Sequence, residues 1–262
     1  MEKPLKNFLP LKGIKHVVLV GSGKGGVGKS TIALNLAVAL KTLSCSVGIL
    51  DADIYGPSLP RLTGTLHLKP ELSSENKIIP HRRYGIQLMS MGHLVEEESP
   101  LVWRGPMLFK TIEQFFKDVD WGPLDVLVID LPPGTGDVAL TIAQKVFVSG
   151  AIVVSTPQNL SLSDTRKALN MFPQIEIPVI GVVENMSYFL EKSGEKLDLF
   201  PRGQIDLYLK EKKIAKLAEI PFHPHVGLSS ESGIPLLESY PDSLEGQAIL
   251  SLAQKVKDYL FK

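Results

Sequence analysis

The sequence predicts an α/β fold in which a mostly parallel β-sheet is covered by helices on both faces. Short, continuously apolar runs recur along the chain, as in strands that are buried on both sides, and segments of helical spacing lie between them. A glycine-rich turn joins the first apolar run to the first helical segment and has the spacing of a phosphate-binding loop. One domain over residues 14–262, after a short lead-in over residues 1–13, accounts for this pattern.

The elements follow one another in a regular order. Strands are predicted at residues 16–21, 47–51, 86–91, 125–130, 151–155, 178–183 and 217–220. Helices are predicted at residues 29–43, 101–116 with an interruption at Gly105 and Pro106, 138–146, 161–171 and 244–260. Residues 62–83 show neither period, so we expect an irregular insert there.

The composition narrows the class of protein. Lysine plus arginine and aspartate plus glutamate number 28 each, so the formal net charge is zero and nothing indicates a nucleic-acid partner. Residues 1–15 contain no long apolar stretch, which argues against a signal peptide or a membrane span. The single cysteine, Cys45, rules out an intrachain disulfide and an all-cysteine metal site within one chain. We therefore expect a cytoplasmic protein without membrane or nucleic-acid partners.

The glycine-rich turn carries the most specific signal. Residues 23–30 read GKGGVGKS, the pattern of a glycine, four residues and then Gly-Lys-Ser. Glycines let successive backbone N–H groups face an anion, and the next helix adds the positive end of its dipole. Lys29 can reach the β- and γ-phosphates, and the Ser30 hydroxyl can ligate Mg²⁺. The nucleotide-binding residues predicted from this loop are Gly23, Lys24, Gly25, Gly26, Val27, Gly28, Lys29, Ser30 and Thr31.

Three aspartates follow predicted strands. Asp51 and Asp53 come at the end of one strand, and Asp130 ends the apolar run 126–129. Ligands of open parallel sheets lie beyond the carboxyl ends of the strands, which brings these carboxylates to the edge that holds the phosphate loop. Each could singly cap a helix or a turn. Together they favour metal and water chemistry, with Asp130 holding Mg²⁺ through water.

These residues and several longer stretches resemble a known family. The loop with its additional lysine, Lys24, is similar to the deviant Walker A motif of the dimeric ATPases MinD, ParA and the nitrogenase iron protein. More narrowly, the chain resembles the Mrp-type ATPases, which are iron–sulfur cluster carriers. The matching stretches are DADIYGPSLPRLTG at 51–64, WRGPM at 103–107, DVLVIDLPPGTGDVALT at 125–141, STPQNLSLSDTRKALNMF at 155–172, GVVENMSYF at 181–189 and AEIPFHPHVGLSSESGIP at 218–235.

The resemblance implies a Mg²⁺-dependent P-loop ATPase that acts as a homodimer in the assembly of iron–sulfur clusters or their transfer to apoproteins. Lys24 would cross the dimer interface to the partner's nucleotide and act in catalysis together with Lys29. Asp53 would position the attacking water, and Asp51 would lie near the Mg²⁺ shell.

The resemblance also implies a switch and a base site. Asp130 and Gly134 would form the switch that senses the γ-phosphate. Asn185 would hydrogen-bond the adenine edge, although it could otherwise be a turn residue at the end of a strand. Residues 220–222, with Pro221 at their centre, would line the base.

The chain departs from the family at the cluster ligands. Members that carry clusters usually have Cys-Pro-x-Cys-Gly after the NMSYF-like segment, so that two chains supply four thiolates to a [4Fe–4S] cluster. Here residues 190–193 read LEKS, and Cys45 lies far away in the sequence. The resemblance therefore implies a cluster for which we assign no ligands. His223 and His225 lack a cysteine partner and are interpreted as loop residues rather than metal ligands.

Two other functions stay open from the sequence. A positioning switch like MinD or ParA would bind membrane or DNA when ATP-bound, but residues 250–262 are only mildly amphipathic and are interpreted as a helix packed on the sheet. A non-enzymatic, ATP-dependent interaction module is the second. The role of Trp103, Arg104 and Met107 in WRGPM is not assigned.

Overall fold

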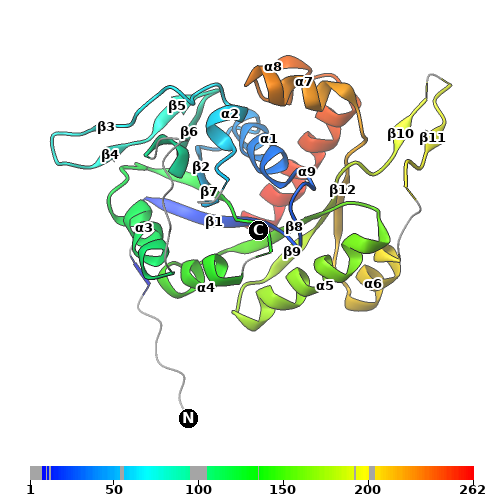
Figure 1. Cartoon of the computed structure of the whole chain (residues 1–262), viewed down its shortest axis with the longest axis horizontal. Coiled ribbons are helices and arrows are strands. Elements are labelled where there is room, and N and C mark those ends of the chain that lie inside the picture. Colours follow the sequence, from blue (N-terminus) through cyan, green and yellow to red (C-terminus); the bar gives the residue numbers. More distant parts are fainter. Residues whose placement is uncertain are drawn as a thin grey trace, which may run out of the picture.

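An eight-stranded β-sheet crosses the computed structural model, which describes residues 8–9, 11, 13–53, 56–94, 105–134, 136–191, 193–200 and 204–262 (Figure 1). Its strands lie in the order β12-β9-β8-β1-β7-β2-β6-β5, and all neighbours are parallel except β5 and β6. The strands are β1 (Ile14–Ser22), β2 (Val47–Asp51), β5 (His81–Arg83), β6 (Ile86–Ser90), β7 (Leu124–Asp130), β8 (Gly150–Ser155), β9 (Val179–Glu184) and β12 (Lys216–Glu219). Two short antiparallel pairs lie outside this sheet: β3 (Glu71–Leu72) with β4 (Ile78–Ile79), and β10 (Phe189–Leu190) with β11 (Lys196–Leu197).

Helices cover both faces of the sheet. On one face lie α1 (Lys29–Thr42), α2 (Leu59–Leu62), α8 (Leu236–Ser239) and α9 (Leu244–Leu260), with α7 (Pro224–Ser232) beside α8. On the other face lie α3 (Gly105–Lys117), α4 (Gly136–Lys145), α5 (Asn159–Gln174) and α6 (Ile205–Lys212). The 3₁₀-helix η1 (Met91–His93) follows β6. Among the described helices, none combines the length and the apolar composition that a membrane crossing requires.

The side chains of β1 show how the strands build two cores. Val18 and Val20 pack with α1 and α9, whereas Val17 and Leu19 pack on the opposite face with α3 and α4. All four are at most 2% exposed, because neighbours in a strand point to opposite faces and both faces are covered. This explains why the strand sequences are continuously apolar rather than alternating.

The register brings the acidic strand ends to one place. Val20 of β1 pairs with Asp130 of β7, and Asp130 pairs in turn with Asp51 of β2. The chain leaves β1 for α1 at this same edge, so the phosphate loop and both aspartates meet at the carboxyl end of the central strands. The fold class predicted from the sequence is confirmed here.

The structure corrects the expectation for residues 62–83. That stretch is not wholly irregular: it contains the β3–β4 pair and then β5, which adds an antiparallel edge strand to the sheet. The predicted strands and the helices α1, α4, α5 and α9 are confirmed, while the short helices α2, α6, α7 and α8 were not predicted. α3 begins at Gly105, where the sequence suggested an interruption. Trp103 and Arg104 lie outside the described residues.

We expect Gly181→Ala to destabilise the sheet. A Cβ at Gly181 in β9 would lie 2.5 Å from the backbone oxygen of Ala215 and 2.7 Å from Leu217 Cγ. To make room for it, β9 would have to move away from β12 and from Ala215, the residue that precedes β12. The expected loss is about 1–3 kcal/mol in the free energy of unfolding, measured by denaturant titration. Gly227→Ala is the matched control, because a Cβ there meets nothing within 4 Å. Equal losses in the two variants would contradict this assignment.

Candidate nucleotide-binding site

The loop between β1 and α1 has the backbone of an anion cradle. Gly26 and Gly28 have φ angles of 77° and 80°, in the left-handed region that only glycine adopts without strain. Gly28 is the N-cap of α1 and no side chain caps the helix, so its first backbone N–H groups are available to a ligand. The local sequence therefore fixes both the shape of the loop and the direction of its donors.

Two glycines of the loop are also required by close packing. A Cβ at Gly23 would lie 2.2 Å from the backbone carbon of Asp164 in α5, and a Cβ at Gly28 would lie 2.3 Å from Nδ2 of Asn185. At Gly26 a Cβ would meet nothing within 4 Å, so there the φ angle alone requires glycine.

A cavity of about 250 Å³ lies directly over the loop. It brings together eight residues that the sequence assigned to nucleotide binding or catalysis and four that it did not assign. The assigned lining residues are Lys24, Gly25, Gly26, Gly28, Lys29, Ser30, Thr31 and Asp53, and the others are Ser22, Ser58, Leu62 and Pro133. Ser58 and Leu62 belong to the stretch 51–64 that carries the family resemblance, and this is the signal that could have pointed to them. Val27 is buried outside this lining, and Gly23 lines a neighbouring cavity of about 260 Å³.

A buried ion pair connects the loop to the sheet. Lys29 Nζ lies 2.6 Å from Asp130 Oδ1, and the two side chains are 7% and 0% exposed. Lys29 Nζ also donates to Ser30 Oγ at 3.2 Å. Burial raises the pKa of Asp130, and the Lys29 ammonium opposes that shift. Among the residues that the structure describes, Asp130 Oδ2 is buried and has no hydrogen-bond partner, so one carboxylate oxygen is left for a ligand.

Asp51 is fully buried and is held by the backbone that follows it. Its Oδ1 accepts from the N–H of Asp53 at 3.0 Å. Its Oδ2 accepts from the N–H groups of Ser58 and Leu59 at 2.9 and 3.1 Å and from Ser90 Oγ at 3.0 Å. These bonds fix the turn that presents Asp53 to the cavity, which is a positioning task that the sequence did not reveal. Burial and the neighbouring Asp130 carboxylate raise the pKa of Asp51 to about 7.

Asn185 lies against the phosphate loop. Its Nδ2 donates to the carbonyl oxygen of Val27 at 2.9 Å, and its backbone N–H donates to Ser155 O at 2.8 Å. Pro221 is buried in the adjoining segment, where Ile220 N–H donates to Glu184 O and Ser187 N–H donates to Ile220 O, both at 2.9 Å. Asn185 and Pro221 thus lie on paired segments beside the loop, but neither lines the cavity over it.

Lys24 has no strong partner within the described chain. It is half-buried, lines the cavity, and its Nζ lies 3.4 Å from Gln158 Oε1. Its own carbonyl oxygen accepts from Ser22 Oγ at 2.8 Å. The backbone of Lys24 is therefore fixed, while its ammonium group makes one long contact.

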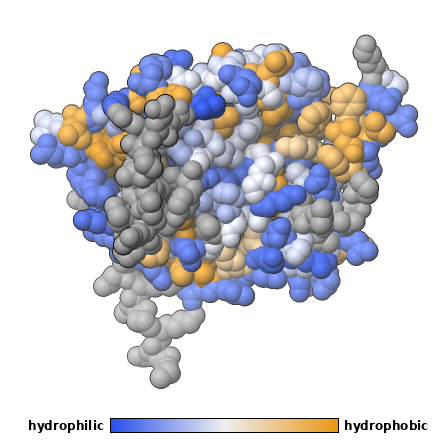
Figure 2. Space-filling view, viewed as in Figure 1, coloured by the Kyte–Doolittle hydropathy of each residue, from blue (hydrophilic) through white to orange (hydrophobic). Residues whose placement is uncertain are grey.

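The region where the family carries cysteines has a different surface here. β10 and β11 form a hairpin, closed by Glu191 N–H donating to Glu195 O at 2.9 Å. Leu197, Leu199 and Phe200 are 38–47% exposed, and Figure 2 shows apolar residues gathered at the end of the molecule that carries β10 and β11. Cys45 is buried between α1 and β2, and burial raises the pKa of its thiol. Lys192 lies outside the described residues.

The buried Asp51 carboxyl predicts a pH-dependent stability. The folded state keeps the Asp51 proton up to about pH 7, whereas the unfolded chain releases it near the ordinary pKa of 3.8. The stabilisation from Asp51 is therefore complete below pH 3.8 and is lost as the pH rises to about 7, by at most about 1.4 kcal/mol per pH unit. We expect the free energy of unfolding of Asp51→Asn, measured by denaturant titration across this interval, to fall less with pH than that of the wild type. If the free energy of unfolding had the same pH dependence in both proteins, the raised pKa of Asp51 would be contradicted.

Comparison with known proteins shows the family of this chain. Residues 13–257 match the ParA family model described as NUBPL iron-transfer P-loop NTPase. The chain is 46% identical over 255 residues to an iron–sulfur cluster carrier protein of Aquifex aeolicus, covering 97% of this chain and 70% of that protein. It is 45% identical over 259 residues to the iron–sulfur cluster transfer protein NUBPL of Mus musculus, covering 98% of this chain and 81% of that one.

Solved structures show the same fold. The nucleotide-binding protein of Archaeoglobus fulgidus, in complex with ADP, superimposes with a TM-score of 0.76 at 40% identity, covering 88% of this chain and 91% of that one. The cell-division ATPase MinD of Pyrococcus furiosus superimposes with a TM-score of 0.69 at 21% identity, covering 93% and 99%, and this supports the fold alone. With the family model matched over nearly the whole described domain, the chain belongs to the iron-transfer P-loop NTPase family of NUBPL and the Mrp-type ATPases.

Proposed function

We propose that this protein is a Mg²⁺-dependent ATPase that acts as a cytoplasmic homodimer in the transfer of iron–sulfur clusters to apoproteins. The observation that carries the ATPase part is the uncapped start of α1 beneath a cavity that also presents Lys29, Ser30 and Asp53. Backbone N–H groups, a helix dipole and a lysine facing one small cavity suit a polyphosphate.

Lys29 changes partner in this proposal. Without nucleotide, its ammonium neutralises the buried Asp130 carboxylate at 2.6 Å. When phosphates fill the cradle, Lys29 turns to the β- and γ-oxygens, where its charge stabilises the transferring phosphoryl group. Asp130 is then released to the metal side of the site. The exchange keeps every buried charge paired at each stage.

Ser30 and Asp130 fit a Mg²⁺ ion. Mg²⁺ prefers oxygen ligands and keeps several waters. The Ser30 hydroxyl and the buried Asp130 Oδ2 are oxygen donors on two residues that both contact the Lys29 ammonium. Bound Mg²⁺ would neutralise charge on the phosphates. Asp51 does not ligate the ion directly in this proposal, because its oxygens already accept four hydrogen bonds, from three backbone N–H groups and Ser90. Asp53, which lines the cavity, positions the attacking water.

Lys24 and Asn185 complete the proposed nucleotide contacts. The long 3.4 Å contact of Lys24 Nζ with Gln158 costs little to break, so the lysine is available to the nucleotide of a second copy. That role makes hydrolysis depend on the homodimer. Asn185 and Pro221 lie on adjoining segments beside the loop, where an adenine edge would meet them.

The iron–sulfur cargo requires ligands from another protein. Relatives of this chain are named iron–sulfur cluster carrier or transfer proteins, and a [4Fe–4S] cluster takes about four thiolates. This chain has one cysteine, so a homodimer offers two thiols, and each Cys45 is buried at the α1–β2 connection. We infer that the protein acts as an ATP-gated partner of a cysteine-bearing carrier or apoprotein.

Substitution of the two loop lysines separates binding from hydrolysis. We expect Lys29→Ala to abolish detectable ATP binding, because the cradle loses its buried cation. Lys24→Ala should keep appreciable ATP binding, but its kcat for hydrolysis should fall by about 10³-fold. This is the lower end of the range for removing a cationic side chain that a second chain supplies to the transition state. Binding is measured with a fluorescent ATP analogue and turnover by phosphate release.

Lys210→Ala on the surface of α6, outside the cavity lining, is the matched control for the loss of one lysine and should behave as the wild type. If Lys24→Ala hydrolysed ATP at the wild-type rate, Lys24 would not act on the nucleotide of the second copy.

Anaerobic reconstitution tests where the cluster is held. Incubated with ferrous iron and sulfide, the purified protein should show no stoichiometric iron–sulfur absorption in the visible range, with or without Mg-ATP. Adding a reconstituted cysteine-bearing carrier and an apoprotein should give transfer that the chain accelerates only with ATP. One [4Fe–4S] cluster per dimer of the chain alone would contradict the inference that a partner holds it.

A further inference from the structure

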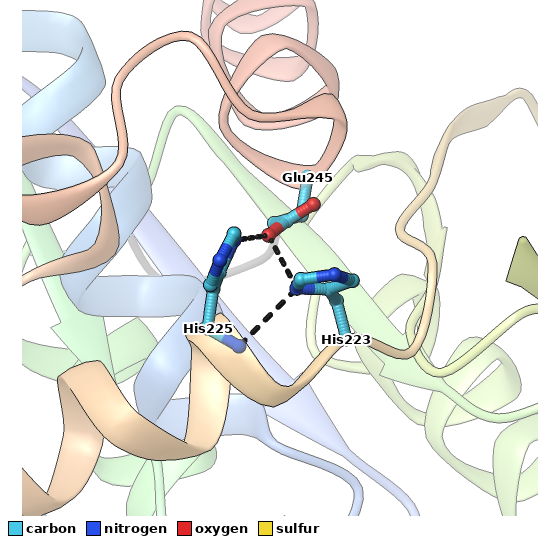
Figure 3. A group of neighbouring side chains, drawn as sticks. All are labelled: His223, His225 and Glu245. Carbon is cyan, nitrogen blue, oxygen red and sulfur yellow. Dashed lines mark hydrogen bonds and ion pairs between the residues drawn. The ribbon is translucent and has the colours of Figure 1, made fainter. Parts of the chain in front are cut away.

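Three metal-ligating side chains meet at the start of α7 and α9, outside the cavity over the phosphate loop. His223 is the N-cap of α7, His225 lies in its first turn, and Glu245 lies in the first turn of α9. Glu245 Oε1 lies 2.8 Å from His225 Nδ1 and 3.1 Å from His223 Nδ1. Figure 3 shows both imidazole rings turned toward this one carboxylate, whose ligand atom lies within 4.8 Å of both histidine nitrogens.

Neither protonation state of His223 Nδ1 suits both of the contacts that this nitrogen makes. Its Nδ1 accepts a long hydrogen bond, 3.3 Å, from the backbone N–H of His225, which requires an unprotonated nitrogen. That same lone pair then faces Glu245 Oε1 at 3.1 Å with no hydrogen between the two acceptors. If Nδ1 is protonated instead, it serves Glu245 but opposes the N–H of His225. A cation bound to the three groups would take the lone pairs of both Nδ1 atoms and of Glu245 Oε1. The long 3.3 Å bond from the His225 N–H would then be lost, but no two acceptors would face each other without a positive charge between them.

The distances from Glu245 Oε1 to the two histidine nitrogens are close to those around a first-row transition ion. Tetrahedral Zn²⁺ binds imidazole nitrogen and carboxylate oxygen at about 2.0–2.2 Å, which places neighbouring ligand atoms roughly 3.3 Å apart. The distances of 2.8 and 3.1 Å fall below that separation by no more than about half an ångström. Small side-chain rotations therefore suffice to admit the ion.

The surroundings hold the ligands in place and leave one side open. The His225 ring stacks on Tyr240 with centroids 3.9 Å apart and planes at 8°. The Glu245 side chain is 3% exposed and is fixed at the beginning of α9, where Ser243 Oγ accepts from Gly246 N–H at 3.1 Å. The His223 and His225 side chains are 38% and 33% exposed. Three protein ligands with an accessible face would leave the fourth position of a bound ion open to water.

We propose that His223, His225 and Glu245 bind one divalent ion of the Fe²⁺ to Zn²⁺ series. Two imidazole nitrogens and one carboxylate suit these borderline ions, whereas Mg²⁺ prefers oxygen ligands alone and a cluster requires thiolates. The sequence indicated that the two histidines are loop residues; the structure adds the third ligand from a helix twenty residues further along. The three ligands lie outside the lining of the cavity over the phosphate loop, and the proposal does not depend on the proposed function.

Zn²⁺ titration of the full-length, tag-free protein after chelator treatment tests the site. Isothermal titration calorimetry should give one Zn²⁺ per chain, and excess Mg²⁺ should leave the affinity unchanged. His223→Ala, His225→Ala and Glu245→Gln should each weaken binding by more than the ~10–100-fold that loss of an outer-shell partner costs. His67→Ala, which removes an exposed histidine outside the cluster, is the matched control and should keep the wild-type affinity.

Two further measurements separate loss of a ligand from loss of the fold. Thermal unfolding in the presence of chelator should give similar midpoints for wild type and the Glu245→Gln variant, and added Zn²⁺ should raise only the wild-type midpoint. Co²⁺ bound to the wild type should give the visible ligand-field bands of a tetrahedral site with nitrogen and oxygen donors. The proposal is overturned if wild type binds Zn²⁺ no more tightly than the double variant His223→Ala/His225→Ala, or if Cys45→Ser or His67→Ala abolishes binding.

Discussion

The buried ion pair between Lys29 and Asp130 is the interaction on which the site depends. It joins the first residue of α1 to the last residue of β7, with Nζ and Oδ1 2.6 Å apart. Removing either partner leaves an unpaired charge at a site where the Asp130 side chain is fully buried, which costs several kcal/mol. A ligand that draws Lys29 away therefore leaves Asp130 to be neutralised by another cation or by a proton. In the function proposed above that cation is Mg²⁺, and phosphate and metal binding are then coupled by the electrostatics of this pair.

Two close approaches keep the loop around this pair in shape. Asn185 from the end of β9 holds the Val27 carbonyl, and the backbone of Asp164 in α5 leaves no room for a side chain at Gly23. The loop is thus held by the end of β9 and by α5. Its N–H groups are oriented before any ligand arrives, so little conformational entropy is lost when phosphate binds. The Asp51 carboxyl likewise holds the backbone around Asp53, through its hydrogen bonds to the N–H groups of Asp53 and Ser58.

The structure places two groups of candidate metal ligands in different parts of the fold. Oxygen donors, suited to Mg²⁺, lie at the phosphate cavity, and the histidine–glutamate cluster lies at the start of α7 and α9. The β10–β11 hairpin, where the family resemblance implied thiols, presents apolar side chains instead. The chain keeps the nucleotide machinery of its family while its one cysteine is buried elsewhere. This is the reason for proposing that the cluster is held by another protein.

The sequence by itself determined the strands, the main helices and the phosphate loop. These features depend on local periodicity and on residues a few positions apart, which a single stretch of sequence contains. Tertiary structure alone decided the contacts across long separations: Ser90 on Asp51, Asn185 on Val27 and Glu245 between two histidines. It also turned part of the irregular stretch after residue 62 into the edge strand β5, because β6 offers that strand a free edge to pair with. No local pattern encodes such pairings, since they form only when the packed sheet brings distant segments together.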